Sequence, residues 1–127
     1  MIEIIVENIV IAKEIIDKIA KISFSGRSAF VIARLIREIN REYDIFEETR
    51  AQLVNKYANK DENGELIVND GMVKIPVNKM NDYHKEVNEI LKTQLTIAAE
   101  PLSFEWLENI ELTPEEALAL EPFIKFE

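Results

Sequence analysis

The chain has 127 residues, of which 47% are hydrophobic and 31% charged, with three glycines, four prolines and no cysteine. This composition is typical of one folded domain with a modest core, and the lack of cysteine excludes disulfides, thiolate metal sites and cysteine nucleophiles. The net charge of −9 disfavours direct nucleic-acid binding, because neutralising phosphates requires a surplus of lysine and arginine.

The N-terminal segment predicts a short strand followed by a helix. Residues 2–6 read IEIIV, a β-branched run that suits a strand, and Asn8 is placed to cap a helix over residues 8–22. Glu3 and Glu7 stand where an export signal carries basic side chains, and no apolar run reaches the ~18 residues of a membrane span. We therefore expect a cytoplasmic protein that does not associate with membranes.

The following segment predicts one long helix over residues 26–58. Apolar side chains recur along it in steps of three and four residues, which is a heptad seam interrupted by Arg50. Such a face usually packs inside its own domain, but a helix of ~45 Å is long enough for the seam to contact a partner or form a homodimer as well. The candidate interface residues are Ile39, Tyr43, Phe46, Arg50, Leu53 and Tyr57.

The rest of the chain predicts shorter elements. Two extended runs around an Asn-Asp-Gly turn predict a β-hairpin, and Thr113-Pro114-Glu115-Glu116 is a capping box with proline in the first turn of a helix. The predicted elements are a hairpin at 65–75, a helix at 79–93, a short strand at 95–99, and helices at 103–109 and 113–121. The sequence thus predicts a single α+β domain over residues 1–127. It is mainly helical, with one long spine helix, several shorter helices and a small β-hairpin or short antiparallel sheet.

Residues 59–70, NKDENGELIVND, resemble an EF-hand calcium loop. Asn59, Asp61, Asn63 and Asp70 occupy positions 1, 3, 5 and 12, where such a loop carries oxygen ligands. An EF-hand loop leads directly into a helix, however, whereas the extended run GMVKIPV follows here. We therefore favour the alternative that residues 61–64 turn the chain from the long helix into the hairpin, and we predict no metal or cofactor.

The sequence contains no recognisable catalytic motif. His84 is the only histidine, and its neighbours on the predicted helix offer no base, nucleophile or strong metal ligand. HExxH spacing, a phosphate-binding loop and a GxGxxG motif are all absent. We therefore predict that the protein is not an enzyme, and an uncharacterised enzyme remains only the third alternative.

Charge is unevenly distributed along the chain. Residues 1–60 hold 10 basic and 9 acidic side chains, whereas residues 61–127 hold 5 and 15. Four arginines near one face of the long helix either bind an anion or form a salt-paired surface with Glu38. The acidic C-terminal side chains either imitate a phosphate backbone or only maintain solubility. The arginines are Arg27, Arg34, Arg37 and Arg41, and the acidic partner-binding candidates are Glu105, Glu108, Glu111, Glu115 and Glu116.

Two blocks, KYANKDENGELIVNDG (56–71) and LENIELTPEEALALEPF (107–123), resemble a family of small uncharacterised proteins encoded by bacteriophages and by prophages of low-GC Gram-positive bacteria. The resemblance extends to the order of the predicted elements over most of the chain. It implies a phage context and transfers no active-site residues.

These observations predict a non-enzymatic phage or prophage protein that acts by stoichiometric protein binding. Its acidic C-terminal half would block a nucleic-acid-handling host defence or replication protein. The alternative is an accessory or chaperone-like factor in virion or tail assembly, for which the long seam helix would be the binding element.

Overall fold

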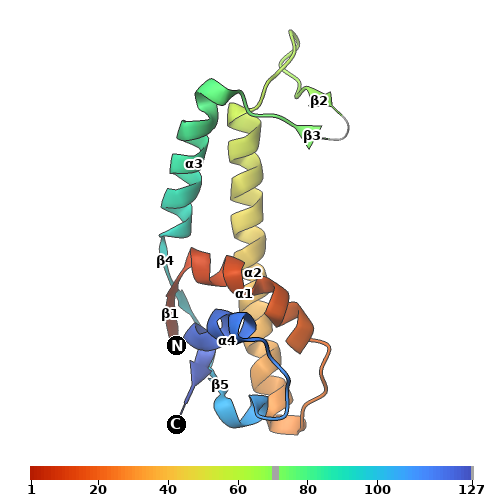
Figure 1. Ribbon diagram of the computed structural model, residues 1–127, viewed down its shortest axis with the longest axis vertical. Coiled ribbons are helices and arrows are strands. Elements are labelled where there is room, and N and C mark those ends of the chain that lie inside the picture. Colours follow the sequence, from red (N-terminus) through yellow and green to blue (C-terminus); the bar gives the residue numbers. More distant parts are fainter. Residues whose placement is uncertain (70–71, 127) are drawn as a thin grey trace.

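The computed structural model describes residues 1–69 and 72–126. A long helix, α2 (Gly26–Tyr57), runs through the molecule, and the other elements pack along it (Figure 1). Helix α1 (Val6–Ile19) lies across the first half of α2, and α3 (Val77–Leu91) runs antiparallel to its second half. The mainly helical α+β architecture predicted from the sequence is confirmed.

Short strands connect distant parts of the chain. Strand β1 (Ile2–Ile5) pairs antiparallel with β4 (Gln94–Ile97), and β5 (Leu102–Ser103) pairs in parallel with β6 (Ile124–Lys125). The side chains of β1 alternate between the core and the surface, as expected of a strand with one covered face. The β1–β4 ladder confirms the predicted strand near residues 95–99 and supplies its partner.

The core lies between α1, the first half of α2 and the C-terminal elements. Apolar residues of α1 recur at helical spacing on the face that meets α2, which is why this short helix is buried along one side. The C-terminal elements that close the core are η1 (Phe104–Leu107), α4 (Pro114–Leu120) and η2 (Glu121–Phe123). The largest fully buried side chains are Ile9, Ile16, Ile19, Leu35, Ile39, Ile97, Leu102, Leu120 and Phe123.

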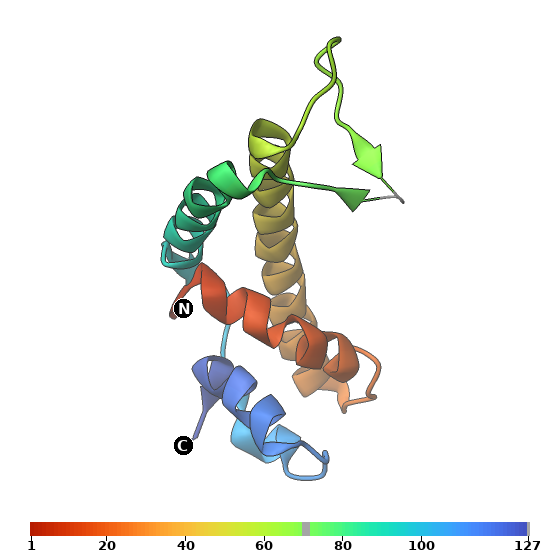
Figure 2. The ribbon, with the colours of Figure 1, turned by 45° about the horizontal axis from the view of Figure 1, so that its top comes forward.

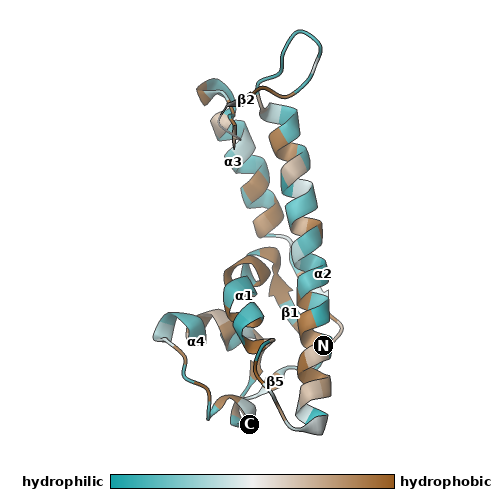
Figure 3. Cartoon of the chain, turned by 90° about the vertical axis from the view of Figure 1, so that its right-hand side faces the viewer, coloured by the Kyte–Doolittle hydropathy of each residue, from teal (hydrophilic) through white to brown (hydrophobic). Residues whose placement is uncertain are grey.

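The second half of α2 and α3 form an arm that extends beyond this core. Figure 3 shows hydrophobic residues gathered in α1, β1 and the first half of α2, with more hydrophilic residues along the arm. The arm is held at its outer end by the edge-on packing of Tyr57 against Tyr83, with ring centroids 6.4 Å apart, and by an ion pair of 3.3 Å between Lys56 and Glu86.

A hairpin projects from the outer end of the arm (Figures 1 and 2). It consists of β2 (Val68–Asn69) and β3 (Met72–Val73), which pair antiparallel, with Val68 opposite Val73. The hairpin lies within the predicted range of 65–75, although its strands are shorter than the apolar runs suggest. Residues 70–71 of the expected turn lie outside the described residues.

Two elements differ from their predicted form. Helix α1 begins at Val6, because the Asn8 side chain turns back and accepts a hydrogen bond of 2.9 Å from the backbone N–H of Ile5. Asn8 is therefore the third residue of the helix and not its cap. The helix expected at 103–109 is only the short 3₁₀ turn η1, because residue 103 belongs to strand β5 and pairs with β6.

Candidate functional site

The acidic candidates occupy one continuous segment at the C-terminal end of the fold. Glu105 lies in η1, Glu115 in the first turn of α4, and Glu108 and Glu111 lie between them. All four side chains are exposed, and within the described part of the chain none of them forms an ion pair. We refer to Glu105, Glu108, Glu111 and Glu115 as the acidic segment.

Glu116, the fifth candidate, has a structural role. Its carboxylate accepts a hydrogen bond of 2.9 Å from the Thr113 backbone N–H, while its own N–H donates to Thr113 Oγ1 at 3.1 Å. This is the predicted capping box, and it is confirmed. The same carboxylate lies 3.3 Å from Lys18 Nζ and so attaches α4 to α1. The Thr113 N–H and, to a smaller degree, Lys18 lower the pKa of Glu116.

We expect Glu116→Gln to lower the melting temperature at neutral pH. The folded-state pKa of Glu116 is lowered, so its carboxylate stabilises the fold above its ordinary pKa of 4.5 and loses that effect as the pH falls through the lowered value. Thermal melting of both proteins between pH 7 and pH 2 should therefore show the difference shrinking in acid. Glu115→Gln, on the exposed neighbour, is the control and should change little. A difference that persists undiminished at low pH would contradict the electrostatic role.

The seam residues of α2 are largely covered by helices of the same chain. Ile39 is fully buried, and Phe46 exposes only 6% of its surface. Tyr43 is half-buried, with Lys13 of α1 placed 5.2 Å from its ring centroid. Leu53 and Tyr57 are half-buried on the side where α3 packs. The contacts favour core packing for Ile39 and Phe46, and a homodimer through the seam remains a prediction.

Arg50 meets a carboxylate on its own helix, as expected for a charge at a seam position. Its Nη2 donates a hydrogen bond of 2.8 Å to Glu47 Oε2, and both side chains remain partly exposed. This hydrogen bond is the main reason that the pKa of Glu47 is lowered and that of Arg50 raised. The seam is therefore interrupted by a satisfied ion pair that needs no second chain.

The calcium-loop candidate is a turn built by one carboxylate. Asp61 Oδ1 accepts hydrogen bonds from the backbone N–H groups of Asn63 and Glu65, at 2.8 and 3.0 Å, and Gly64 has a positive φ of 78°. The turn predicted for residues 61–64 is thus confirmed, and Asn59 lies just before it. Asp70 lies outside the described residues. Over residues 1–69 and 72–126, no group of three or more acidic or histidine side chains is arranged to hold a metal ion.

The four arginines of α2 that were predicted to bind an anion or pair with Glu38 fall into two pairs. Arg41 contacts Glu38 at 3.1 Å, and Arg37 lies 3.9 Å from the same carboxylate. These two arginines therefore belong to a salt-paired surface, one of the alternatives predicted for the whole set. Arg27 and Arg34 are exposed and form no ion pair with any residue that the structure describes.

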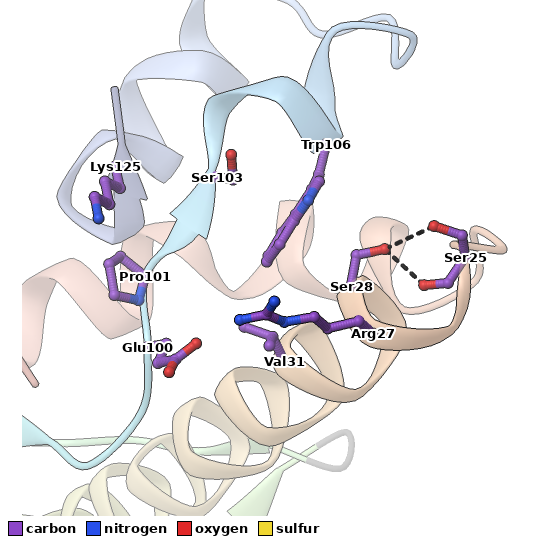
Figure 4. A pocket seen from close by; sticks show the side chains of 9 residues that line it. All are labelled: Ser25, Arg27, Ser28, Val31, Glu100, Pro101, Ser103, Trp106 and Lys125. Carbon is purple, nitrogen blue, oxygen red and sulfur yellow. Dashed lines mark hydrogen bonds between the residues drawn. The ribbon is translucent and has the colours of Figure 1, made fainter. Parts of the chain in front are cut away.

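Arg27 and Arg34 instead line a groove between the start of α2 and the segment that follows β4. The groove consists of two adjoining hollows of about 630 and 690 Å³, which share Arg27, Val31 and Glu100. In Figure 4, the Arg27 side chain extends across the groove towards Glu100, and the Trp106 ring from η1 points into the same space. The other lining residues are Ser25, Ser28, Pro101, Ser103 and Lys125 in the first hollow, and Met1, Phe30, Ala98 and Ala99 in the second.

The sequence prediction missed this groove, because its walls come from residues that are far apart in the chain. One local signal was available. Phe30 lies three residues after Arg27 and four before Arg34, so the three share a helix face that the buried seam does not use. Phe30 exposes 73% of its surface there.

No protein-family model matches the chain, and no similar curated protein or solved structure was found. Among the helices of the described residues, none has the length and apolar character that a membrane span requires.

Proposed function

We propose that the protein is a non-enzymatic binding module that acts stoichiometrically on another protein, and that its acidic segment contacts a basic surface of that partner. The observation that carries this proposal is the row of four exposed carboxylates without basic partners in the described structure. In the phage or prophage context that the sequence resemblance implies, the partner is a nucleic-acid-handling defence or replication protein in the host cytoplasm.

The acidic segment is mounted on ordered structure. Leu107, at the end of η1, and Leu120, at the end of α4, expose 5% and 0% of their surface, so both elements are anchored in the core. The capping box and the contact with Lys18 fix the start of α4. Charges held in place lose less conformational entropy on binding than charges on a mobile tail, and they attract a basic surface at long range.

A pull-down from host lysate with matched variants tests this proposal. Changing all four carboxylates of the acidic segment to glutamine should reduce capture of the partner by about tenfold or more, because the association depends on charge. Raising the salt to about 0.5 M should have a similar effect, since exposed charges are then screened over a few ångströms. The control variant changes four exposed carboxylates elsewhere to glutamine, which are Glu14, Glu48, Glu62 and Glu89.

The captured protein is identified by mass spectrometry. A nucleic-acid-handling host protein that is retained by the wild type and the control, but lost with the acidic-segment variant, supports the proposal. Equal capture by all three proteins would remove the acidic segment as the binding surface.

A role in virion or tail assembly is the second candidate, and the projecting hairpin favours it. Leu66, Ile67, Val68 and Met72 expose 36%, 40%, 55% and 68% of their surface, and Val77 at the start of α3 exposes 90%. Exposed apolar side chains gathered on one projection are typical of a protein interface. In the same pull-down, this alternative predicts capture of tail or capsid proteins that survives the acidic-segment variant but is lost when Val68 and Met72 are changed to serine.

A further inference from the structure

The groove combines features of a recognition site that the acidic segment does not share. Arg27, Phe30 and Arg34 lie on one exposed face of α2, with Phe30 between the two arginines along the helix. Arginine and aromatic side chains are the residue types that contribute most to protein interfaces, and a guanidinium group recognises a carboxylate in a two-point contact. Arg27 and Arg34 form no ion pair with any residue that the structure describes, so their guanidinium groups are available to a ligand in the groove.

The walls of the groove define the size of the occupant. Met1, Ala98 and Ala99 line the hollow beside Phe30, which measures about 690 Å³ and therefore has room for large side chains. The adjoining hollow of about 630 Å³ continues past Arg27 to Trp106 and Lys125. Together the two hollows form a groove suited to a short extended peptide. Its apolar side chain would lie near Phe30 and its carboxylates near Arg27 and Arg34.

The charges around the groove disfavour a polyanion. Glu100 lines both hollows, so a continuous phosphate backbone running along the groove would meet its negative charge. Nucleic-acid affinity grows with the number of neutralised phosphates, and this groove offers only Arg27, Arg34 and Lys125. One or two carboxylates beside an apolar group fit these charges better.

We propose that this groove binds an acidic peptide segment of a partner protein, with a large apolar side chain of the peptide against Phe30 and its carboxylates on Arg27 and Arg34. This site uses none of the residues of the acidic segment, so the proposal holds or fails independently of the function proposed above.

Fluorescence anisotropy with synthetic peptides tests the proposal. The probes are fluorescein-labelled octapeptides with a central phenylalanine, leucine or tryptophan flanked by two aspartates or glutamates, and matched peptides with asparagine and glutamine instead. The acidic peptides should bind about tenfold or more tightly than their uncharged counterparts, and Arg27→Gln with Arg34→Gln should remove that difference, because both arginines contribute charge-assisted hydrogen bonds. Phe30→Ala should weaken all peptides with a large central side chain.

The paired arginines of the same helix provide the control. Arg37→Gln with Arg41→Gln removes the same charge outside the groove and should change peptide affinity by less than about twofold, as should the acidic-segment variant. Thermal melting verifies that each variant is folded. Equal binding of acidic and uncharged peptides would overturn the proposal. Two other results would also overturn it. Tight binding of a single-stranded oligo-dT that is lost in the Arg27 and Arg34 variant would assign the groove to nucleic acid. A dimer in sedimentation that the same variant abolishes would assign the groove to a second copy of the chain.

Discussion

Phe46→Glu is expected to lower the free energy of unfolding by about 3 kcal/mol or more, because it places an unpaired charge at a buried position. Phe46 exposes only 6% of its surface, whereas its neighbour Ile45 on the same helix exposes 51%. Ile45→Glu is therefore the matched control, and we expect it to change stability by less than about 0.5 kcal/mol. Urea denaturation of the two variants and the wild type measures both effects.

The same variant distinguishes core packing from a dimer interface along the seam. If the seam packs only within the chain, the wild type sediments as a monomer and the variant unfolds easily. A wild-type dimer that Phe46→Glu converts into a stable, folded monomer would contradict core packing and restore the interface.

Phe123→Ala is expected to destabilise the protein by about 3–5 kcal/mol, the usual cost of removing a fully buried phenylalanine side chain. Phe123 exposes 0% of its surface and belongs to the hydrophobic core that α1, α2 and β1 also form. Phe126, three residues further on, exposes 63% and only stacks against Phe104, with ring centroids 5.5 Å apart. Phe126→Ala should cost no more than about 1 kcal/mol.

Equal melting temperatures for Phe123→Ala and Phe126→Ala would show that η2 does not close the core. A loss of stability confined to Phe123→Ala would establish that the last turn of the described chain is part of the folded unit. Circular dichroism at 222 nm during thermal melting suffices for this comparison.

The long helix was predictable because its signals are local and repeated. Between Arg27 and Tyr57 the sequence contains no helix breaker, and its apolar residues keep helical spacing except at Arg50, so the observed bounds, Gly26–Tyr57, lie close to the predicted 26–58. The capping box of α4 was equally local, since Thr113 and Glu116 identify the helix start without reference to the rest of the chain.

The elements that the sequence did not predict depend on contacts between distant residues. Strand β5 exists because Leu102 pairs with Ile124, and nothing near residue 102 reveals that partner. Asn8 is a residue type that often caps helices, but here its side chain accepts a hydrogen bond from the Ile5 backbone N–H. Local preference alone does not decide between these two arrangements.

The candidate surfaces were predictable to different degrees. The acidic residues and the capping role of Glu116 were visible in the sequence, but the contact of Glu116 with Lys18 depends on how α1 and α4 pack in the fold. In the same way, the sequence placed the four arginines on one helix and could not tell that Arg27 and Arg34 border a groove formed by residues 98–106.

The strand pairings also determine the order in which parts of the fold can form as the chain is synthesised. β1 pairs with β4, whose residues lie about 90 positions later in the chain, and the parallel pair of β5 with β6 requires residues 124–125. A nascent chain that has not yet emerged to Phe123 therefore lacks the C-terminal side chains that complete the core around α1 and α2. The α2–α3 arm needs nothing beyond residue 91. The arm closes shorter loops than the core, and its residues emerge earlier, so the most deeply buried part of the molecule is the last to be completed on the ribosome.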